Sequence, residues 1–158
     1  MKFQKHILSS GLRVITIPMP DNPTVTALVM VEAGSKYETK KQSGLSHFLE
    51  HMCFKGTVKR PTSKEISSLM DSLGANFNAF TSQEHTGYYV KVDNRHLDVA
   101  LDLISDIYQN SLFKEEEIEV MSKEAKAELD AEIADLGSTD KTPAGNALKR
   151  VSAESAAN

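Results

Sequence analysis

Cysteine is almost absent from this sequence, since Cys53 is the only one. No internal disulfide can form, and a metal site has to rely on histidine and carboxylate ligands. The chain also lacks an apolar run near the ~20 residues that span a bilayer, and residues 1–10 lack the apolar block of a signal peptide. We therefore expect no membrane partner and a cytoplasmic location of the bacterial type; the matrix of an organelle fits the same composition.

An excess of basic residues is lacking as well. The sequence has 18 Lys and Arg against 22 Asp and Glu, a net charge of −4. Without a basic stripe to bind phosphates, nucleic acid is not expected as a partner. The 158 residues are 40% apolar, which suits one soluble domain with a substantial core.

Local patterns predict alternating groups of strands and helices. A capping box, Thr62 to Glu65, opens the clearest helix, whose apolar residues recur at helical spacing until Gly74. The predicted strands cover residues 3–9, 12–18, 24–33, 75–82 and 84–92, and the predicted helices cover residues 43–54, 62–73, 97–108 and 114–136. The order β-β-β-α-α-β-β-α-α indicates an α+β fold in which a mixed β-sheet packs against helices.

The last part of the chain differs in composition. Residues 137–158 are polar and rich in Ala and Ser, with no core-building pattern. We therefore expect a domain over residues 1–136 and a tail over residues 137–158 that is compatible with disorder.

The segment His47-Phe48-Leu49-Glu50-His51 lies in the first predicted helix, for which Ser43 is the expected cap. A helical wheel places His47, Glu50 and His51 roughly 140–240° from the start of an apolar stripe, on the face opposite the expected core. That stripe consists of Leu45, Phe48, Leu49 and Met52.

Two imidazoles at positions i and i+4 can bind one cation, and zinc is the common choice for nitrogen and oxygen ligands. Zinc lowers the pKa of a bound water from about 15.7 to about 7, and a neighbouring carboxylate such as Glu50 can accept the proton as the water attacks a carbonyl. Two histidines leave the cation short of protein ligands, so a third, a carboxylate, is expected from elsewhere in the chain.

The motif and its surroundings resemble the pitrilysin/insulysin family of zinc peptidases. The reversed order His-x-x-Glu-His is the hallmark of inverzincins, and the similarity is closest to the branch that includes mitochondrial processing peptidase and its bacterial relatives. It extends over about residues 3–119, through Gly34–Glu38, Gly44–Ser46, Met52–Thr57, Asn78–Thr81 and Tyr88-Tyr89.

The resemblance implies roles for individual residues. His47 and His51 correspond to zinc ligands and Glu50 to the general base. A substrate is expected to bind as an added β-strand along the edge formed by Asn78, Ala79 and Phe80. The third zinc ligand is expected to be a glutamate some seventy-odd residues after the motif.

The position of that glutamate is open, because the fourth helix departs from the family pattern. Without a gap the ligand falls on Glu128, and the family's supporting glutamate is replaced by Met121. With one turn deleted, the ligand is Glu124 and its supporter is Glu117. For a single Glu in so acidic a helix, the alternative is a solvated surface charge.

The sequence thus predicts a zinc metalloendopeptidase that cleaves extended or unfolded polypeptides. The family encloses its substrate between related domains, so a second related domain or subunit is expected, in a homo- or hetero-oligomer. The alternative is a truncated or non-catalytic zinc-binding chain that serves as a binding or assembly subunit.

Overall fold

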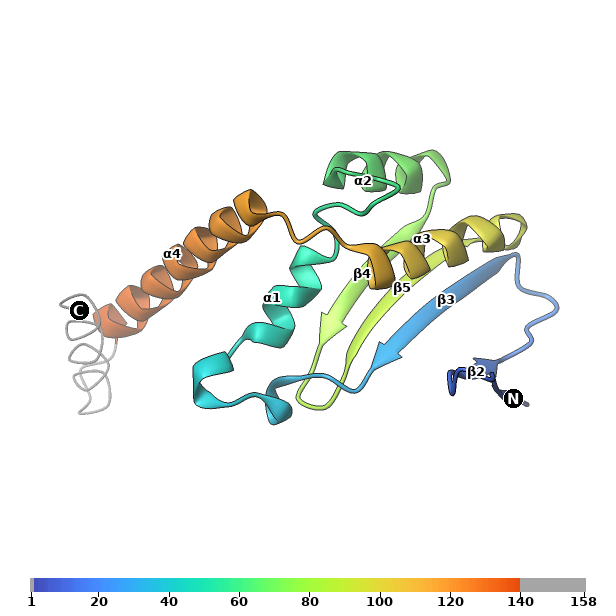
Figure 1. The fold of residues 1–158 in the computed structure, drawn as a ribbon, viewed down its shortest axis with the longest axis horizontal. Helices are drawn as coiled ribbons and strands as arrows, with labels where there is room; N and C mark the ends of the chain where they lie inside the picture. Colours follow the sequence, from blue (N-terminus) through green and yellow to red (C-terminus); the bar gives the residue numbers. More distant parts are fainter. Residues whose placement is uncertain (1, 140–158) are drawn as a thin grey trace.

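The computed structural model of the chain describes residues 2–139 (Figure 1). The elements follow the predicted order. Helices cover Leu45–Met52 (α1), Ser63–Ser72 (α2), Leu97–Asn110 (α3) and Glu115–Thr139 (α4), and strands cover Gln4–Ile7 (β1), Arg13–Thr16 (β2), Thr24–Val31 (β3), Asn76–Thr81 (β4) and Thr86–Asp93 (β5).

The main sheet has the strand order β3-β5-β4. The predicted hairpin is confirmed, since β4 and β5 pair antiparallel with Ala79 opposite Tyr88, and β3 pairs antiparallel with the other side of β5. β3 and β4, which α1 and α2 connect, run parallel to each other because both pair antiparallel with β5, which lies between them. The α+β class is therefore confirmed, while every strand pair within residues 2–139 is antiparallel.

The core lies between one face of this sheet and helices α2 and α3 (Figure 1). Val90 and Val92 of β5 are each 2% exposed, and they belong to the same buried cluster as Met70 of α2 and Leu103 of α3. The opposite sheet face carries exposed apolar side chains, among them Leu28 and Met30. The helices therefore bury one face of the sheet.

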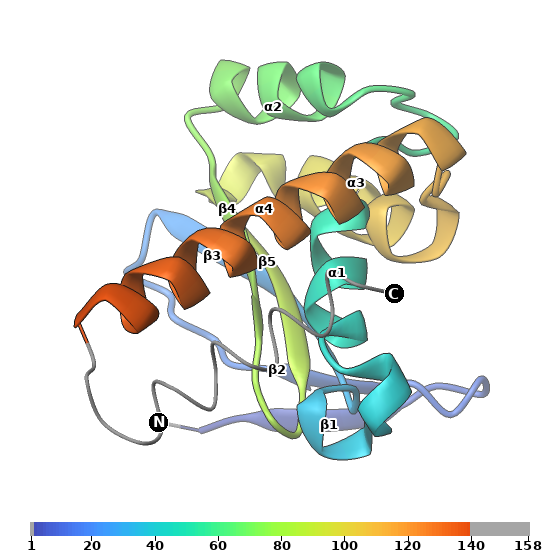
Figure 2. The same ribbon diagram turned by 90° about the vertical axis from the view of Figure 1, so that its left-hand side faces the viewer.

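The first two strands form a separate two-stranded sheet, shorter than the sequence predicts. Its apolar side chains Ile7 and Ile15 are exposed. Figure 2 shows this hairpin lying below the main sheet, away from the layer of α2 and α3. The alternation of apolar residues thus predicts that these two strands form, but it does not predict whether another part of the protein buries their apolar side chains.

Helix α4 projects away from the sheet (Figure 1). It contacts α1, and α1 contacts β4, so the three elements that carry the predicted site are adjacent. α4 continues through residues 137–139, and the rest of the expected tail, residues 140–158, lies outside the described residues. Within residues 2–139, none of the helices has the length and apolar character needed to cross a membrane.

Candidate metal centre and peptide-binding edge

Helix α1, which carries the motif, is capped by a residue other than the one expected. Ser43 is not the N-cap; this position is occupied by Gly44, in the left-handed region at φ 87°. The Glu38 carboxylate accepts hydrogen bonds from the backbone N–H groups of Gly44 and Ser46, both at 2.7 Å. These bonds, Ser46 first, hold the pKa of Glu38 below its ordinary value because they favour the charged form. A carboxylate is also favoured by the helix dipole at this end.

The two histidines of the motif come together on the exposed side of α1. Their Nε2 atoms are 3.0 Å apart and their rings lie edge to face. Two nitrogens that bind one tetrahedral zinc at about 2.0–2.1 Å lie about 3.3 Å from each other. The spacing of His47 and His51 therefore fits a shared metal ion.

Glu50 does not lie on the solvent face that the helical wheel predicts. Its residue is only 8% exposed, and the Thr81 hydroxyl donates a hydrogen bond to its Oε2. Leu45 and Leu49, expected in the core, are 41% and 40% exposed. The prediction is wrong because periodicity alone does not show that α1 packs against β4, which turns Glu50 inward.

The structure does not bring a third metal ligand to the histidines among the side chains that it describes. Glu124 is one of these side chains, and it is exposed. The side chain of Glu128 lies outside the described residues, although its backbone belongs to α4. Glu117, the expected supporter of Glu124, lies 3.6 Å from the Lys55 ammonium.

Strand β4 is an edge strand, and its backbone offers free hydrogen-bonding groups next to the motif. Ser82 donates its N–H to the His85 carbonyl across the turn. Because antiparallel pairs alternate, the N–H and C=O groups of Ala79 and Thr81 point away from β5. The Asn78 side chain covers one of these groups, since its Oδ1 accepts the Ala79 N–H at 2.9 Å.

Phe80, the third residue predicted for this edge, points across the exposed sheet face. Its ring lies over Gly87, where an added Cβ would be 2.3 Å from the ring. It also meets the His85 ring edge to face, with the centroids 6.0 Å apart. Phe80 thus borders the edge from the open face, while Ala79 and Thr81 supply the free backbone groups.

A cleft of about 430 Å³ joins the start of α1 to the end of β4. Both His47 and Thr81 line it, so it opens directly beside the predicted centre. Its lining comprises Ser35, Glu38, Ser43, Gly44, His47, Thr81, Ser82 and Gln83.

Residues 13–149 match the family described as insulinase, peptidase family M16. This chain belongs to that family. Over 111 residues it is 47% identical to an uncharacterized zinc protease of Rickettsia felis. This alignment covers 70% of the chain and 27% of the relative. The M16 chain is also 47% identical over 112 residues to the mitochondrial-processing peptidase subunit beta of Dictyostelium discoideum, covering 71% and 24%.

A further relative of this M16 chain is subunit 1 of the human mitochondrial cytochrome b-c1 complex. It is 40% identical over 116 residues, which cover 73% of the chain and 24% of the relative. The M16 chain therefore spans about a quarter of the length of the curated relatives that it matches.

Two residues that shape the candidate site escaped sequence reasoning. Glu38 caps α1 from a preceding loop, and Thr81 binds Glu50 from a strand 31 residues further along the chain. Neither position has a spacing signal, because Glu38 acts from an irregular loop six and eight residues before its partners and Thr81 acts across a tertiary contact. Among local signals, only their presence in the segments that resemble the family points to them.

Proposed function

We propose that this chain forms the catalytic part of a zinc-dependent endopeptidase that acts on extended or unfolded polypeptides. One observation carries the proposal. The backbone of Thr81 belongs to the free edge of β4, and its hydroxyl binds the buried Glu50, which lies in α1 between His47 and His51 in the sequence. A peptide paired with this edge would therefore pass beside the predicted base.

His47 and His51 would hold the metal, and Glu128 would supply the third ligand, with Glu124 as the alternative. When bound, zinc would lower the pKa of a water molecule to about 7 and polarise the substrate carbonyl. Glu50 would accept a proton from the attacking water and later return one to the leaving amine. Thr81 would keep the Glu50 carboxylate oriented through its hydrogen bond.

The substrate would add to the sheet as a strand, because backbone pairing depends little on side-chain identity. The groups available for pairing are those of Ala79 and Thr81. The Asn78 side chain would turn aside from the Ala79 N–H to admit a peptide carbonyl. Such capture requires an extended backbone, which is why we propose unfolded segments as substrates.

Zinc content and cleavage of a quenched peptide test the proposal together. We expect one zinc per chain, lost in His47→Ala and His51→Ala and retained in the control His85→Ala, which alters a histidine outside the pair. Full zinc content in both motif variants would place the metal elsewhere.

The base is tested with the metal in place. We expect Glu50→Gln to keep its zinc while hydrolysis falls by about 10²–10⁴, the usual contribution of a general base. The matched control Glu84→Gln changes an exposed carboxylate on the neighbouring turn and should cleave at the normal rate. An undiminished rate in zinc-loaded Glu50→Gln would remove Glu50 from the mechanism.

We further propose that full activity requires a second related domain or subunit. In support, the chain spans about a quarter of its relatives' length, and two of these relatives are named as subunits. Holding the scissile bond in near-attack geometry and excluding water require an enclosed site. Titrating candidate partner domains into the zinc-loaded chain should raise turnover, whereas rapid turnover by the isolated monomer would contradict this requirement.

A second candidate function is that of a non-catalytic assembly subunit. The similarity to a cytochrome b-c1 complex subunit favours it, because that name describes a component of a complex. Zinc binding at full stoichiometry with no cleavage by any combination of chain and partner would support this function over the first.

A further inference from the structure

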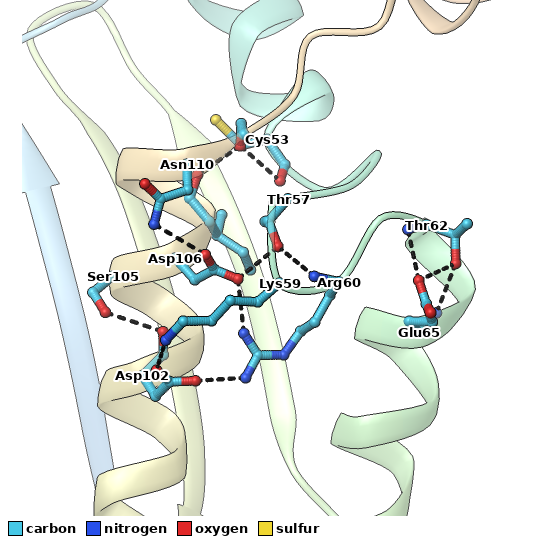
Figure 3. A network of polar contacts seen from close by, with 12 residues as sticks. Cys53, Thr57, Lys59, Arg60, Thr62, Glu65, Asp102, Ser105, Asp106 and Asn110 are labelled. Carbon is cyan, nitrogen blue, oxygen red and sulfur yellow. Dashed lines mark hydrogen bonds and ion pairs between the residues drawn. The ribbon is translucent and has the colours of Figure 1, made fainter.

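A buried polar network lies immediately after the motif helix (Figure 3). Its centre is the Asp106 carboxylate of α3, whose side chain is 1% exposed. Asp106 accepts hydrogen bonds from Thr57 at 2.5 Å, Arg60 at 2.8 Å and Asn110 at 3.0 Å. Burial raises the pKa of Asp106, but these three bonds outweigh burial and hold the pKa below its ordinary value.

Arg60 bridges two carboxylates of the same helix. Its second terminal nitrogen donates to Asp102 at 2.6 Å, and Lys59 also pairs with Asp102. The Thr57 hydroxyl accepts the Arg60 backbone N–H at 3.0 Å while it donates to Asp106. The cations of Lys59 and Arg60 thus balance the two carboxylates of α3. Side-chain and backbone hydrogen bonds together hold the loop over residues 57–60 against α3.

The same loop is bonded to the segment that leads into α4. Gly56 accepts the Leu112 N–H at 3.0 Å, and Val58 donates its N–H to the Asn110 carbonyl at 3.1 Å. Lys114, just before α4, donates to the Pro61 carbonyl at 2.7 Å. These bonds therefore join residues 56–61, which begin four residues after α1 ends at Met52, to the segment that leads into α4.

Helix α4 projects away from the sheet (Figure 1) and contacts α1, so the junction at its base and this contact together fix its direction. A small rotation at its base grows with distance along a helix that rises about 1.5 Å per residue. A rotation of about 10° would move a carboxylate about 14–20 Å along α4, where Glu124 and Glu128 lie, by roughly 2–3 Å relative to the histidine pair. A metal–ligand bond does not tolerate such a shift.

We infer that the Thr57–Arg60–Asp106 network is a positioning device that sets α4, and with it the third metal ligand, against α1. None of these three residues belongs to the histidine pair or to the edge of β4. The inference rests on the proposed function only for the metal, since the geometric role of the network can be measured without it.

Spin labels test the geometric role in the full chain. Labels introduced by Leu45→Cys on α1 and Ser122→Cys on α4, with Cys53→Ala to remove the native thiol, report the distance between the helices by pulsed electron paramagnetic resonance. We expect a single narrow distance distribution, which broadens or shifts in Asp106→Asn and in the milder Arg60→Lys. The control Asp93→Asn breaks an exposed Asp–Arg pair far from α4 and should leave the distribution unchanged.

Metal binding, measured in unlabelled variants that remain folded by circular dichroism, tests the consequence. We expect the zinc dissociation constant to rise on the order of tenfold in Asp106→Asn and Arg60→Lys, as is typical when supporting residues of a metal site are altered. The visible spectrum of bound Co²⁺ should change in the same variants and not in Asp93→Asn. Loss of stability alone would not alter that spectrum in folded protein.

The outcomes separate this inference from the proposed function. Unchanged label distances in both network variants would overturn it, and so would a changed distance with unaltered zinc affinity and Co²⁺ spectrum. If the unmutated chain bound no zinc, the proposed function would fail, while the label distances would still decide whether the network places α4.

Discussion

Replacing Thr81 by valine removes the hydroxyl that binds Glu50 while it keeps the branched shape of the side chain. Glu50 is 8% exposed, so water can replace the lost donor only in part. A hydrogen bond to a charged group contributes about 1.5–3 kcal/mol, against about 0.5–1.5 kcal/mol for a neutral pair. We expect Thr81→Val to lower the free energy of unfolding by about 1.5–3 kcal/mol at neutral pH, and Thr81→Ser to lower it less.

Urea unfolding of four chains measures this difference: the unmutated protein, Thr81→Val, Glu50→Gln and the double variant. In the Glu50→Gln background the loss caused by Thr81→Val should shrink to about 0.5–1.5 kcal/mol, because the partner is then neutral. An equal loss in both backgrounds would show that the valine acts through packing and not through the Glu50 carboxylate. No loss in either would refute the contact and, with it, the orientation of the proposed base.

Two further predictions concern the cap of α1 and the core. The folded pKa of Glu38 is lowered from its ordinary value of 4.5, so the stability that it contributes is present above that value and is lost as the pH falls through the folded pKa. Urea midpoints followed from about pH 6 to pH 3 should therefore fall more steeply in the unmutated chain than in Glu38→Gln, and parallel curves would exclude a charged cap. On α3, Leu103→Ala should destabilise the fold by about 2–5 kcal/mol because the residue is fully buried, whereas Leu101→Ala, 48% exposed, should cost little in the same thermal unfolding assay.

Features that arise within one helical turn or one hairpin were predictable from sequence. The capping box of α2 is present, with Thr62 and Glu65 each accepting the backbone N–H of the other. The β4–β5 hairpin forms where alternating residues flank a short turn. In both cases the partners are so close along the chain that their spacing predicts the contact.

Predictions that required knowledge of a neighbouring element failed or stayed open. The wheel for α1 assigned Leu45 and Leu49 to the core and Glu50 to solvent, and the structure reverses the environments of these residues. The composition of the two N-terminal segments predicted that they are strands. It did not predict that they form a sheet separate from the main sheet. The choice between Glu128 and Glu124 stays a prediction, because it depends on where α4 passes α1.

The sequence by itself determined the histidine pair, since residues at positions i and i+4 of a helix share one face whatever surrounds it. Only the tertiary structure decided that Glu50 is buried against Thr81 and that β4 is an edge strand of the main sheet. The same holds for the bond between Asp106 and Arg60, which are 46 residues apart and join the loop after α1 to α3. The physical reason is that these contacts form when separate elements pack together. The periodicity of apolar residues does not predict a hydrogen bond between a helix and a distant strand. A carboxylate such as that of Asp106 is buried with hydrogen-bond donors only once the elements that carry those donors have packed around it.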